Sequence, residues 1–372
     1  APLEETPAEE APAATPAQPA PGPAAGQAGS QSPAWQEEWD KLAAAAKAEG
    51  ALSIVTLVGA GLRDAVKTFS DAFPGIEIQQ QQFASASQAA PKILQEREAG
   101  LYTFDIGRLQ TLTGLGTLKP KGVWTPLRPL LFRADVTGDQ YWQDGFEAGW
   151  LDSGKELTYA FGVKVTGFFT VNTDMVKDGE ITSFNDLLSP KWKGKIQLED
   201  PRSGASSAPM TSVRLKLGNE PIRKLYKEQD AAILRDTRLI AENMVRGKYA
   251  VSVGLREEIL VEFTNQGLGK NLKNLDIPEA SYYSANNIFV MNRAPHPNAA
   301  KLFVNWLLTR DGQDKWVKAS LEANSRRTDV PPLVPDSAPK PGRTYVNVTR
   351  EDTLGEVEKT RVLLYDILGI TN

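Results

Sequence analysis

The chain of 372 residues contains no cysteine and a single histidine, His296. The absence of cysteine excludes disulfides, zinc–thiolate centres and cysteine nucleophiles, and any Ser-His-Asp triad would have to use His296. That residue stands between Pro295 and Pro297, a setting typical of an exposed turn. Because no paired-carboxylate or nucleophile motif stands out either, the sequence argues against an enzyme and predicts neither a metal site nor a cofactor.

Long apolar runs and an excess of basic charge are also missing. No hydrophobic stretch approaches the roughly 18 residues that a membrane-spanning helix needs. With 42 Lys and Arg against 46 Asp and Glu, the formal charge is -4, so there is no basic excess to neutralise nucleic-acid phosphates. The hydrophobic share of 41% and the mean hydropathy of -0.34 are typical of a globular protein that is neither embedded in a membrane nor wholly disordered.

Residues 1–33 differ in composition from everything that follows. They hold ten alanines, eight prolines and four glutamates, but no aromatic residue and no Lys or Arg. Such a segment buries too little apolar surface to offset its ordering entropy, so we predict a disordered, extended tether. A tether of this kind behind a removed leader is typical of a surface-anchored bacterial lipoprotein, and we expect an extracytoplasmic protein whose only membrane attachment is such an anchor. A plain secreted protein is the alternative.

From residue 34 onward, the apolar periodicities of helices and strands alternate. In the first part, helices over residues 35–49, 62–73 and after 85 separate predicted strands at 52–58, 76–79 and 104–106. A second region begins near residue 156, with predicted strands at 167–172, 196–200, 249–253 and 288–291. This order predicts an α/β fold of mainly parallel sheets flanked by helices, and its length calls for two lobes.

Small and hydroxyl-bearing residues follow several of the predicted strands. These residues are Gly59, Ala60 and Gly61, then Ser85, Ala86 and Ser87, and then Ser203, Gly204, Ala205 and Ser206. Ligands of parallel sheets lie beyond the carboxyl ends of the strands, where small residues let backbone N–H groups approach and helix dipoles favour negative charge. Plain helix capping is the alternative explanation for each serine.

Charged and aromatic side chains complete the candidate ligand-binding site. Together with Arg108 and Arg256, the serine loops predict a receptor for a carboxylate or phosphate on a small organic molecule. The alternative for Arg256 is a surface ion pair with Glu257 or Glu258. Glu257 is itself a candidate ligand-binding residue. Tyr282 and Tyr283 also belong to the candidate set, because their rings fall near the predicted junction of the lobes.

Four stretches then carry a family resemblance through their order and spacing. They are residues 94–106 with EREAG and FDI, 190–204 with PKWKGKI and DPRSG, 294–313 with APHPNAAKLF and DGQ, and 324–331 with NSRRTDVP. In these stretches the chain resembles the extracellular solute-binding proteins of bacterial ABC importers, in the ferric-ion-binding-like branch of the bilobal, type II periplasmic-binding-protein family.

The resemblance implies a two-lobed periplasmic-binding-protein fold, each lobe a mainly parallel sheet flanked by helices. Hinge strands join the lobes, and the ligand cleft lies between them. Lobe 1 is then expected at residues 34–155 plus 280–325, and lobe 2 at residues 156–279 plus 326–372. The expected partners are a small-molecule solute and the membrane subunits of an ABC importer, and the receptor is expected to be a monomer.

The resemblance also provides a test for iron. Relatives that bind ferric iron place two adjacent tyrosines just after the strand that residues 249–253 match, but this chain has Gly254, Leu255 and Arg256 there. A guanidinium repels a cation and attracts an anion, so we expect no dityrosine iron site. Tyr282 and Tyr283 are the only substitute pair, and a ferric ion or a metal complex remains an alternative ligand.

Three function classes follow in order. The leading prediction is a receptor that closes its lobes on a solute and delivers it to an importer. A ligand-sensing receptor on the same fold is an alternative that sequence does not separate from import. An enzyme on this fold is the third. The helical periodicity near the C-terminus predicts a last helix packed on the second lobe.

Overall fold

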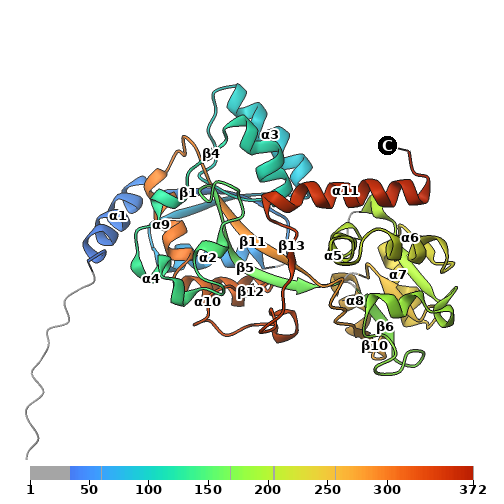
Figure 1. The fold of residues 1–372 in the computed structure, drawn as a ribbon. Coiled ribbons are helices and arrows are strands. Elements are labelled where there is room, and N and C mark those ends of the chain that lie inside the picture. The colour runs from blue at the N-terminus through green and yellow to red at the C-terminus, as the bar shows by residue number, and fades with distance from the viewer. Residues whose placement is uncertain (1–33, 60, 168, 204–205, 256, 372) are drawn as a thin grey trace, which may run out of the picture.

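The computed structural model describes residues 34–59, 61–167, 169–203, 206–255 and 257–371 (Figure 1). The predicted tether, residues 1–33, lies outside the described residues. Two β-sheets with separate hydrophobic cores form two lobes, and the mixed α/β, two-lobed architecture matches the predicted fold class. Within the described residues, no helix is long and apolar enough to span a bilayer.

The first sheet has eight strands within the described residues. Its order is β12 (Asn324–Ser325), β5 (Thr158–Thr166), β11 (Tyr282–Met291), β3 (Ile106–Arg108), β1 (Ala51–Leu57) and β2 (Glu77–Phe83), while β4 (Trp124–Thr125) and β13 (Val346–Asn347) pair with β11. Strands β1, β2 and β3 are parallel, and β11 runs antiparallel to β3 and β5. Central β1 is buried along almost its whole length, whereas β2 alternates in exposure, as expected for an edge strand.

The second sheet has five strands within the described residues. Its order is β10 (Leu272–Asn274), β6 (Phe169–Asn172), β9 (Val251–Val253), β7 (Ile196–Glu199) and β8 (Ala232–Leu234). Strands β7, β8 and β9 are parallel, and β6 runs antiparallel to β9 and β10. Both sheets therefore contain the parallel strands that the alternating sequence pattern predicted.

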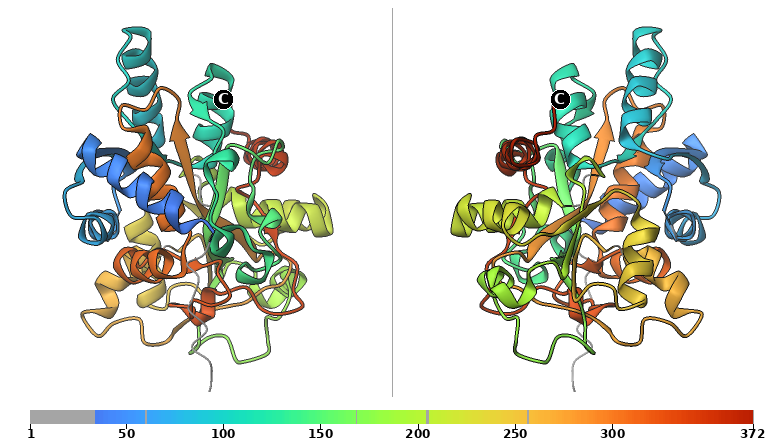
Figure 2. Two further views of the ribbon diagram at one scale, coloured as in Figure 1. Left: turned by 90° about the vertical axis from the view of Figure 1, so that its left-hand side faces the viewer. Right: turned by 90° about the vertical axis from the view of Figure 1, so that its right-hand side faces the viewer.

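Helices flank both sheets, and three of them lie near the residues at which the periodicity predicted them, 35–49, 62–73 and after 85. Those of the first lobe are α1 (Gln36–Glu49), α2 (Leu62–Ala72), α3 (Ala86–Glu98), α4 (Ala134–Thr137), α9 (Pro297–Leu307), α10 (Arg310–Ser320) and the π-helix η1 (Leu112–Leu118). Those of the second lobe are α5 (Ser207–Leu217), α6 (Glu220–Lys227), α7 (Thr237–Val245) and α8 (Glu257–Thr264). Short 3₁₀ turns complete the connections, among them η6 (Phe184–Leu188), at whose start the backbone N–H of Ser183 donates to the carboxylate of Asp186 at 2.8 Å. Figure 2 views the molecule from its two ends, with the first lobe in front on the left and the second in front on the right.

The chain crosses between the lobes at points that differ from the expected boundaries. Strand β5, which the expected boundary at residue 156 placed in lobe 2, pairs with β11 throughout and lies in the first sheet. Strand β13, also expected in lobe 2, pairs with β11 as well. The reason is backbone pairing: β5 and β11 form one long antiparallel ribbon, and the chain leaves it for lobe 2 only after Thr166.

The last helix, α11 (Glu351–Leu368), contacts both lobes (Figure 1). Its body packs on α5 and α6, as predicted, where the guanidinium of Arg214 binds Glu356. Its first turn is attached to lobe 1, because Glu351 accepts a bond from Lys119 at 2.6 Å and its backbone N–H donates to the carbonyl of Leu151 at 2.8 Å. The prediction of a helix on the second lobe alone is therefore incomplete.

Candidate functional site

The carboxyl ends of the parallel strands in the two lobes point toward each other across the hinge. In lobe 1, β3 and β5 both run antiparallel to β11, so β3 and its parallel neighbour β1 run in the direction in which β5 leaves for lobe 2. In lobe 2, β6 runs away from the hinge, and β9 and β7 run back toward it. Loops at these carboxyl ends therefore form the facing sides of the interlobe region, as predicted.

Four segments of lobe 1 meet at its strand ends, and we call Gly59, Arg108, Asn286 and Glu322 the lobe-1 edge. Arg108, the last residue of β3, forms an ion pair with Glu322, which follows α10. The amide of Asn286, on β11, donates to the same carboxylate at 3.4 Å. A Cβ added to Gly59 would lie 3.0 Å from the other oxygen of Glu322. A glycine is therefore needed here for the loop to approach the carboxylate closely.

The ion pair of the lobe-1 edge is largely removed from water, which disfavours the charged forms of both side chains. The side chains of Arg108 and Glu322 are only 13% and 24% exposed. Burial raises the pKa of Glu322 and lowers the pKa of Arg108, so for each group desolvation outweighs the attraction of its partner. The Nε of Arg108 is buried and has no hydrogen-bond partner among the described residues. This N–H donor remains available to a ligand.

The strand ends of lobe 2 carry different chemistry, and we call Glu199, Ser206, Ser207, Tyr226 and Gly254 the lobe-2 edge. Glu199 ends β7 and is fully buried. Gly254, directly after β9, has φ +97°, and a Cβ there would lie 2.5 Å from the Cβ of Glu199. The Oγ of Ser207 is buried without a hydrogen-bond partner in the described part of the chain. Burial raises the pKa of Tyr226, and nearby Glu199 adds to this shift, so its phenol stays protonated.

Helices begin at both edges without side-chain caps. The residues Gly61, Ser85 and Ser206 precede α2, α3 and α5, and none of them forms a side-chain capping hydrogen bond. Plain capping by Ser206, the alternative considered above, is therefore not what the geometry shows. The N–H groups of Leu62 and Gln88 donate to the backbone carbonyls of Gly59 and Ser85 at 3.4 and 3.2 Å. The first turns of α2 and α5 lack side-chain caps, and they present the positive end of the helix dipole to a ligand or to water.

The predicted site residues divide into three groups. Gly59, Arg108 and Ser206 belong to the two edges, while Gly61, Ser85, Ala86 and Ser203 lie in the segments that follow β1, β2 and β7. Ala60, Gly204, Ala205 and Arg256 lie outside the described residues, as do the side chains of Ser87 and Glu257. Tyr282 and Tyr283 form the third group, at the start of β11 in the first sheet.

The tyrosine pair cannot converge on a single ion. Adjacent residues of a strand point to opposite faces, and Tyr282 and Tyr283 are both within β11. No group of three or more His, Asp or Glu that could hold a metal occurs within the described residues. His296, predicted to be exposed, is instead partly buried, because its Nδ1 lies 2.9 Å from the buried carboxylate of Asp105.

Several members of the two edges were not predicted from the sequence. Asn286, Glu322 and Tyr226 reach the strand ends only through long-range packing, and no local pattern marks them. Glu199 directly precedes the DPRSG stretch, so its position at a strand end was a usable signal. Arg202, which directly precedes the predicted site residue Ser203, binds its neighbour Asp200.

Comparison with known proteins now identifies the family. The family model described as bacterial extracellular solute-binding protein matches residues 64–332. The chain belongs to this family of bacterial extracellular solute-binding proteins. As a solute-binding protein, it is an extracytoplasmic transport protein rather than an enzyme, as the sequence predicted.

One sequence relative and several solved structures resemble this solute-binding protein. A Haemophilus influenzae protein described as uncharacterized is 26% identical over 154 residues, which cover 39% of this chain and only 44% of the relative. Iron-bound HitA from Pseudomonas aeruginosa has a TM-score of 0.63 at 17% identity, covering 85% of this chain and 99% of HitA.

Two further structures have the same fold with other ligands in their descriptions. AfuA from Actinobacillus pleuropneumoniae, with exogenous fructose-6-phosphate bound, has a TM-score of 0.59 at 18% identity and covers 86% of this chain and 99% of AfuA. The spermidine/putrescine transporter substrate-binding protein PotD from Streptococcus pneumoniae has a TM-score of 0.61 at 16% identity, and the match covers 85% of this chain and 99% of PotD. At these identities the likeness establishes the two-lobed fold.

Proposed function

We propose that this solute-binding protein is the receptor of a bacterial ABC importer and binds a small organic anion, through a carboxylate or phosphate, between the lobe-1 and lobe-2 edges. The observation that carries the proposal is the pair of helix starts without side-chain caps, that of α2 in lobe 1 and that of α5 in lobe 2. Helix starts provide backbone N–H donors and a positive dipole end, which suit an anionic group.

Side chains at both edges add to this preference. The buried Nε of Arg108 provides a charged donor from lobe 1, and the buried Oγ of Ser207 provides a neutral donor from lobe 2. A ligand that accepts hydrogen bonds from both donors links the two lobes. It then stabilises the closed form by its differential affinity for that form, with bending at the hinge strands β5 and β11. The closed monomer is the form that the importer's membrane subunits would recognise.

The related structures are compatible with more than one ligand class. Fructose-6-phosphate in the AfuA structure is an organic phosphate, which supports the proposed class. A cation or metal complex is the second candidate, because the carboxylates of Glu199 and Glu322 lie at opposite edges. The buried, ion-paired state of Glu322 makes it a poorer cation ligand than a free carboxylate.

The test is thermal unfolding of the full chain with succinate, inorganic phosphate, fructose-6-phosphate, putrescine and ferric chloride. A ligand at 100 times its Kd should add about 2.7 kcal/mol to the unfolding free energy, which raises Tm by at least about one to two degrees. We expect stabilisation by anions, and its loss in Arg108→Gln and Ser207→Ala.

The matched control is Arg223→Gln in lobe 2, since that guanidinium pairs with Asp366 on the surface and should leave the shift unchanged. Stabilisation by putrescine or ferric chloride alone would contradict the anion proposal. It would favour the cation candidate and leave the family assignment intact.

A further inference from the structure

A cavity lies beside the hinge strands, and we call it the hinge cavity. Its volume is about 660 Å³, within the range of small-molecule sites. Strands β5 and β11, the loop at residues 143–148 and the C-terminal segment at residues 339–350 line it. Its ionisable lining side chains are Asp144, Tyr283, Arg326, Lys340, Arg343, Tyr345 and Arg350.

The hinge cavity is separate from the interlobe site. Tyr283 lines the cavity and Asn286 belongs to the lobe-1 edge, and both lie on β11. They are three residues apart with no bulge between them, so their side chains point to opposite faces of the strand. A ligand in the hinge cavity therefore contacts a different face of the hinge from a ligand between the lobes.

Arg326 is a buried cation without a carboxylate partner. It is only 2% exposed, and its guanidinium donates to the carbonyls of Ala160 at 3.1 Å, Gln143 at 2.6 Å and Gly145 at 3.5 Å. Among the described residues, no carboxylate oxygen lies within 4.0 Å of its guanidinium nitrogens. A buried guanidinium normally receives a counter-charge, because its desolvation is costly.

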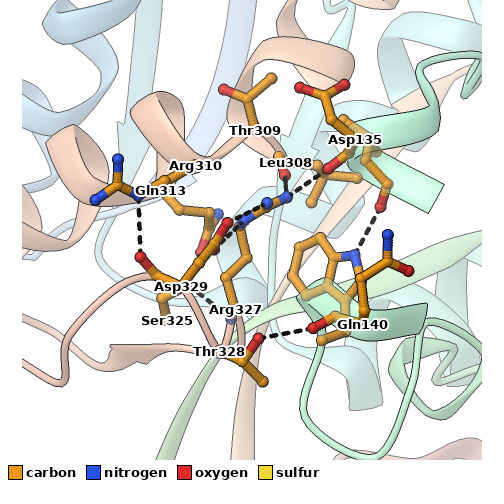
Figure 3. A network of polar contacts seen from close by, with 12 residues as sticks. Asp135, Gln140, Leu308, Thr309, Arg310, Gln313, Ser325, Arg327, Thr328 and Asp329 are labelled. Atoms are coloured by element: carbon orange, nitrogen blue, oxygen red, sulfur yellow. Dashed lines mark hydrogen bonds and ion pairs between the residues drawn. The ribbon is translucent and has the colours of Figure 1, made fainter. Parts of the chain in front are cut away.

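The neighbouring residue Arg327 shows how such a cation is normally neutralised (Figure 3). It is 3% exposed and binds both oxygens of Asp329 at 2.8 Å, while its Nη1 donates to the carbonyls of Asp135 and Leu308. Two adjacent arginines are thus equally buried, and only Arg327 has an anionic partner within the described residues. The difference leaves a place for an external anion beside Arg326.

Other groups of the cavity strengthen the positive field. Lys340 and Arg343 share the single carboxylate of Asp276, and Arg350 binds Asp352. With Arg326, these are four cations, against the three carboxylates of Asp144, Asp276 and Asp352. Burial also raises the pKa of Tyr283, so its hydroxyl remains a hydrogen-bond donor at neutral pH.

We propose that the hinge cavity binds a small organic anion whose carboxylate or phosphate group is held by Arg326, with Tyr283 as a second donor. The anion supplies the counter-charge that Arg326 lacks. The size of the cavity leaves room for a body of several carbon atoms beyond the anionic group. This proposal does not depend on which solute occupies the interlobe site.

The experiment is calorimetric titration of the full chain with succinate and, separately, with inorganic phosphate, which distinguishes carboxylate from phosphate. The variants are Arg326→Gln, Tyr283→Phe, Arg350→Gln and, for the interlobe site, Arg108→Gln. We expect at least one probe to bind the wild type. Its affinity should fall about tenfold or more in Arg326→Gln, as for a lost charged hydrogen bond, and severalfold in Tyr283→Phe. Arg108→Gln should retain this binding.

Circular dichroism first establishes that each variant is folded. If Arg326→Gln does not fold, Tyr283→Phe and Arg350→Gln decide the question, since both alter only the rim or one hydroxyl. Absence of binding by either probe at millimolar concentration would overturn the proposal. So would unchanged affinity in Tyr283→Phe and Arg350→Gln, or a loss confined to Arg108→Gln, which would place the anion between the lobes.

Discussion

The lobe-1 and lobe-2 edges face each other at equivalent places in their sheets, yet they are built from different groups. The lobe-1 edge contains a paired charge, Arg108 with Glu322, whose mutual attraction does not offset its desolvation. The lobe-2 edge contains neutral hydroxyls around the buried carboxylate of Glu199 at the end of β7. We therefore propose that lobe 1 contributes a charged donor to the ligand and that lobe 2 contributes neutral hydroxyl donors.

Replacing glycines at positions of close backbone approach should cause the largest loss of stability, and the loss should differ between the two lobes. A Cβ at Gly61, with φ +74°, would lie 2.2 Å from the backbone carbonyl oxygen of Ala319, whereas one at Gly254 would meet the side chain of Glu199. We expect Gly61→Ala to cost about 4 kcal/mol of unfolding free energy and Gly254→Ala about 3, because strain and overpacking add. Urea unfolding measures both.

The control for this prediction is Gly100→Ala, which has φ +76° but nothing within 4 Å of the added Cβ. It should cost only about 1 kcal/mol, as expected for the left-handed conformation alone. Equal losses in all three variants would show that the conformation, and not the close approach of neighbouring atoms, determines the cost.

Removal of one charge should destabilise the lobe-1 edge by a smaller amount. Arg108→Gln leaves the carboxylate of Glu322 without its counter-charge, and we expect a loss of about 2 kcal/mol at neutral pH. Burial raises the pKa of Glu322 above 4.5 in the folded protein. The contribution of this carboxyl group to the free energy of unfolding is therefore present below pH 4.5 and is lost as the pH rises through the folded pKa. The variant's deficit should therefore shrink on acidification.

The double variant Arg108→Gln with Glu322→Gln should recover most of the lost stability at neutral pH. Urea unfolding at pH 4 and pH 7 measures both effects. A deficit that stays constant with pH and persists in the double variant would show that packing of the Arg108 side chain, rather than its charge, is responsible.

Asp200, beside the lobe-2 edge, should affect stability least, and its pH dependence should be opposite to that of Glu322. The hydrogen bond from Arg202 lowers the pKa of Asp200 below 3.8. The contribution of the Asp200 carboxylate to the free energy of unfolding is therefore present above pH 3.8 and is lost as the pH falls through the folded pKa. We expect Asp200→Asn to cost about 1 kcal/mol or less at pH 7, since Arg202 is partly exposed. In unfolding measurements the difference from wild type should shrink as the pH falls below 3.8 and through the folded pKa, and a deficit that grew there would contradict this assignment.

Much of the fold could be predicted because helix and strand periodicities are local. Residues 35–49 predicted α1, with Gly50 at its end, and the apolar run at residues 52–58 predicted β1. The boundary near residue 156 failed because the pairing of β5 with β11 joins residues more than 100 positions apart. No periodicity reports on such a contact.

The candidate site was predictable only in part, for the same reason. Serine and glycine loops after strands are visible in the sequence, and they lie at the two edges. Glu322 and Asn286 join Arg108 only because α10 and β11 fold back onto the end of β3. The pair Tyr282 and Tyr283 looked like one site in the sequence, but strand geometry separates their side chains.

The sequence by itself determined the element types, the two-lobed α/β class, the family and the loops that follow the strands, because these depend on short-range patterns of apolar, small and capping residues. Only the tertiary structure decided which charges are neutralised. Arg326 and Arg327 are adjacent and chemically identical, yet one is paired with Asp329 and the other faces the hinge cavity. Desolvation and pairing depend on the three-dimensional surroundings of a side chain, and a linear sequence does not contain them explicitly.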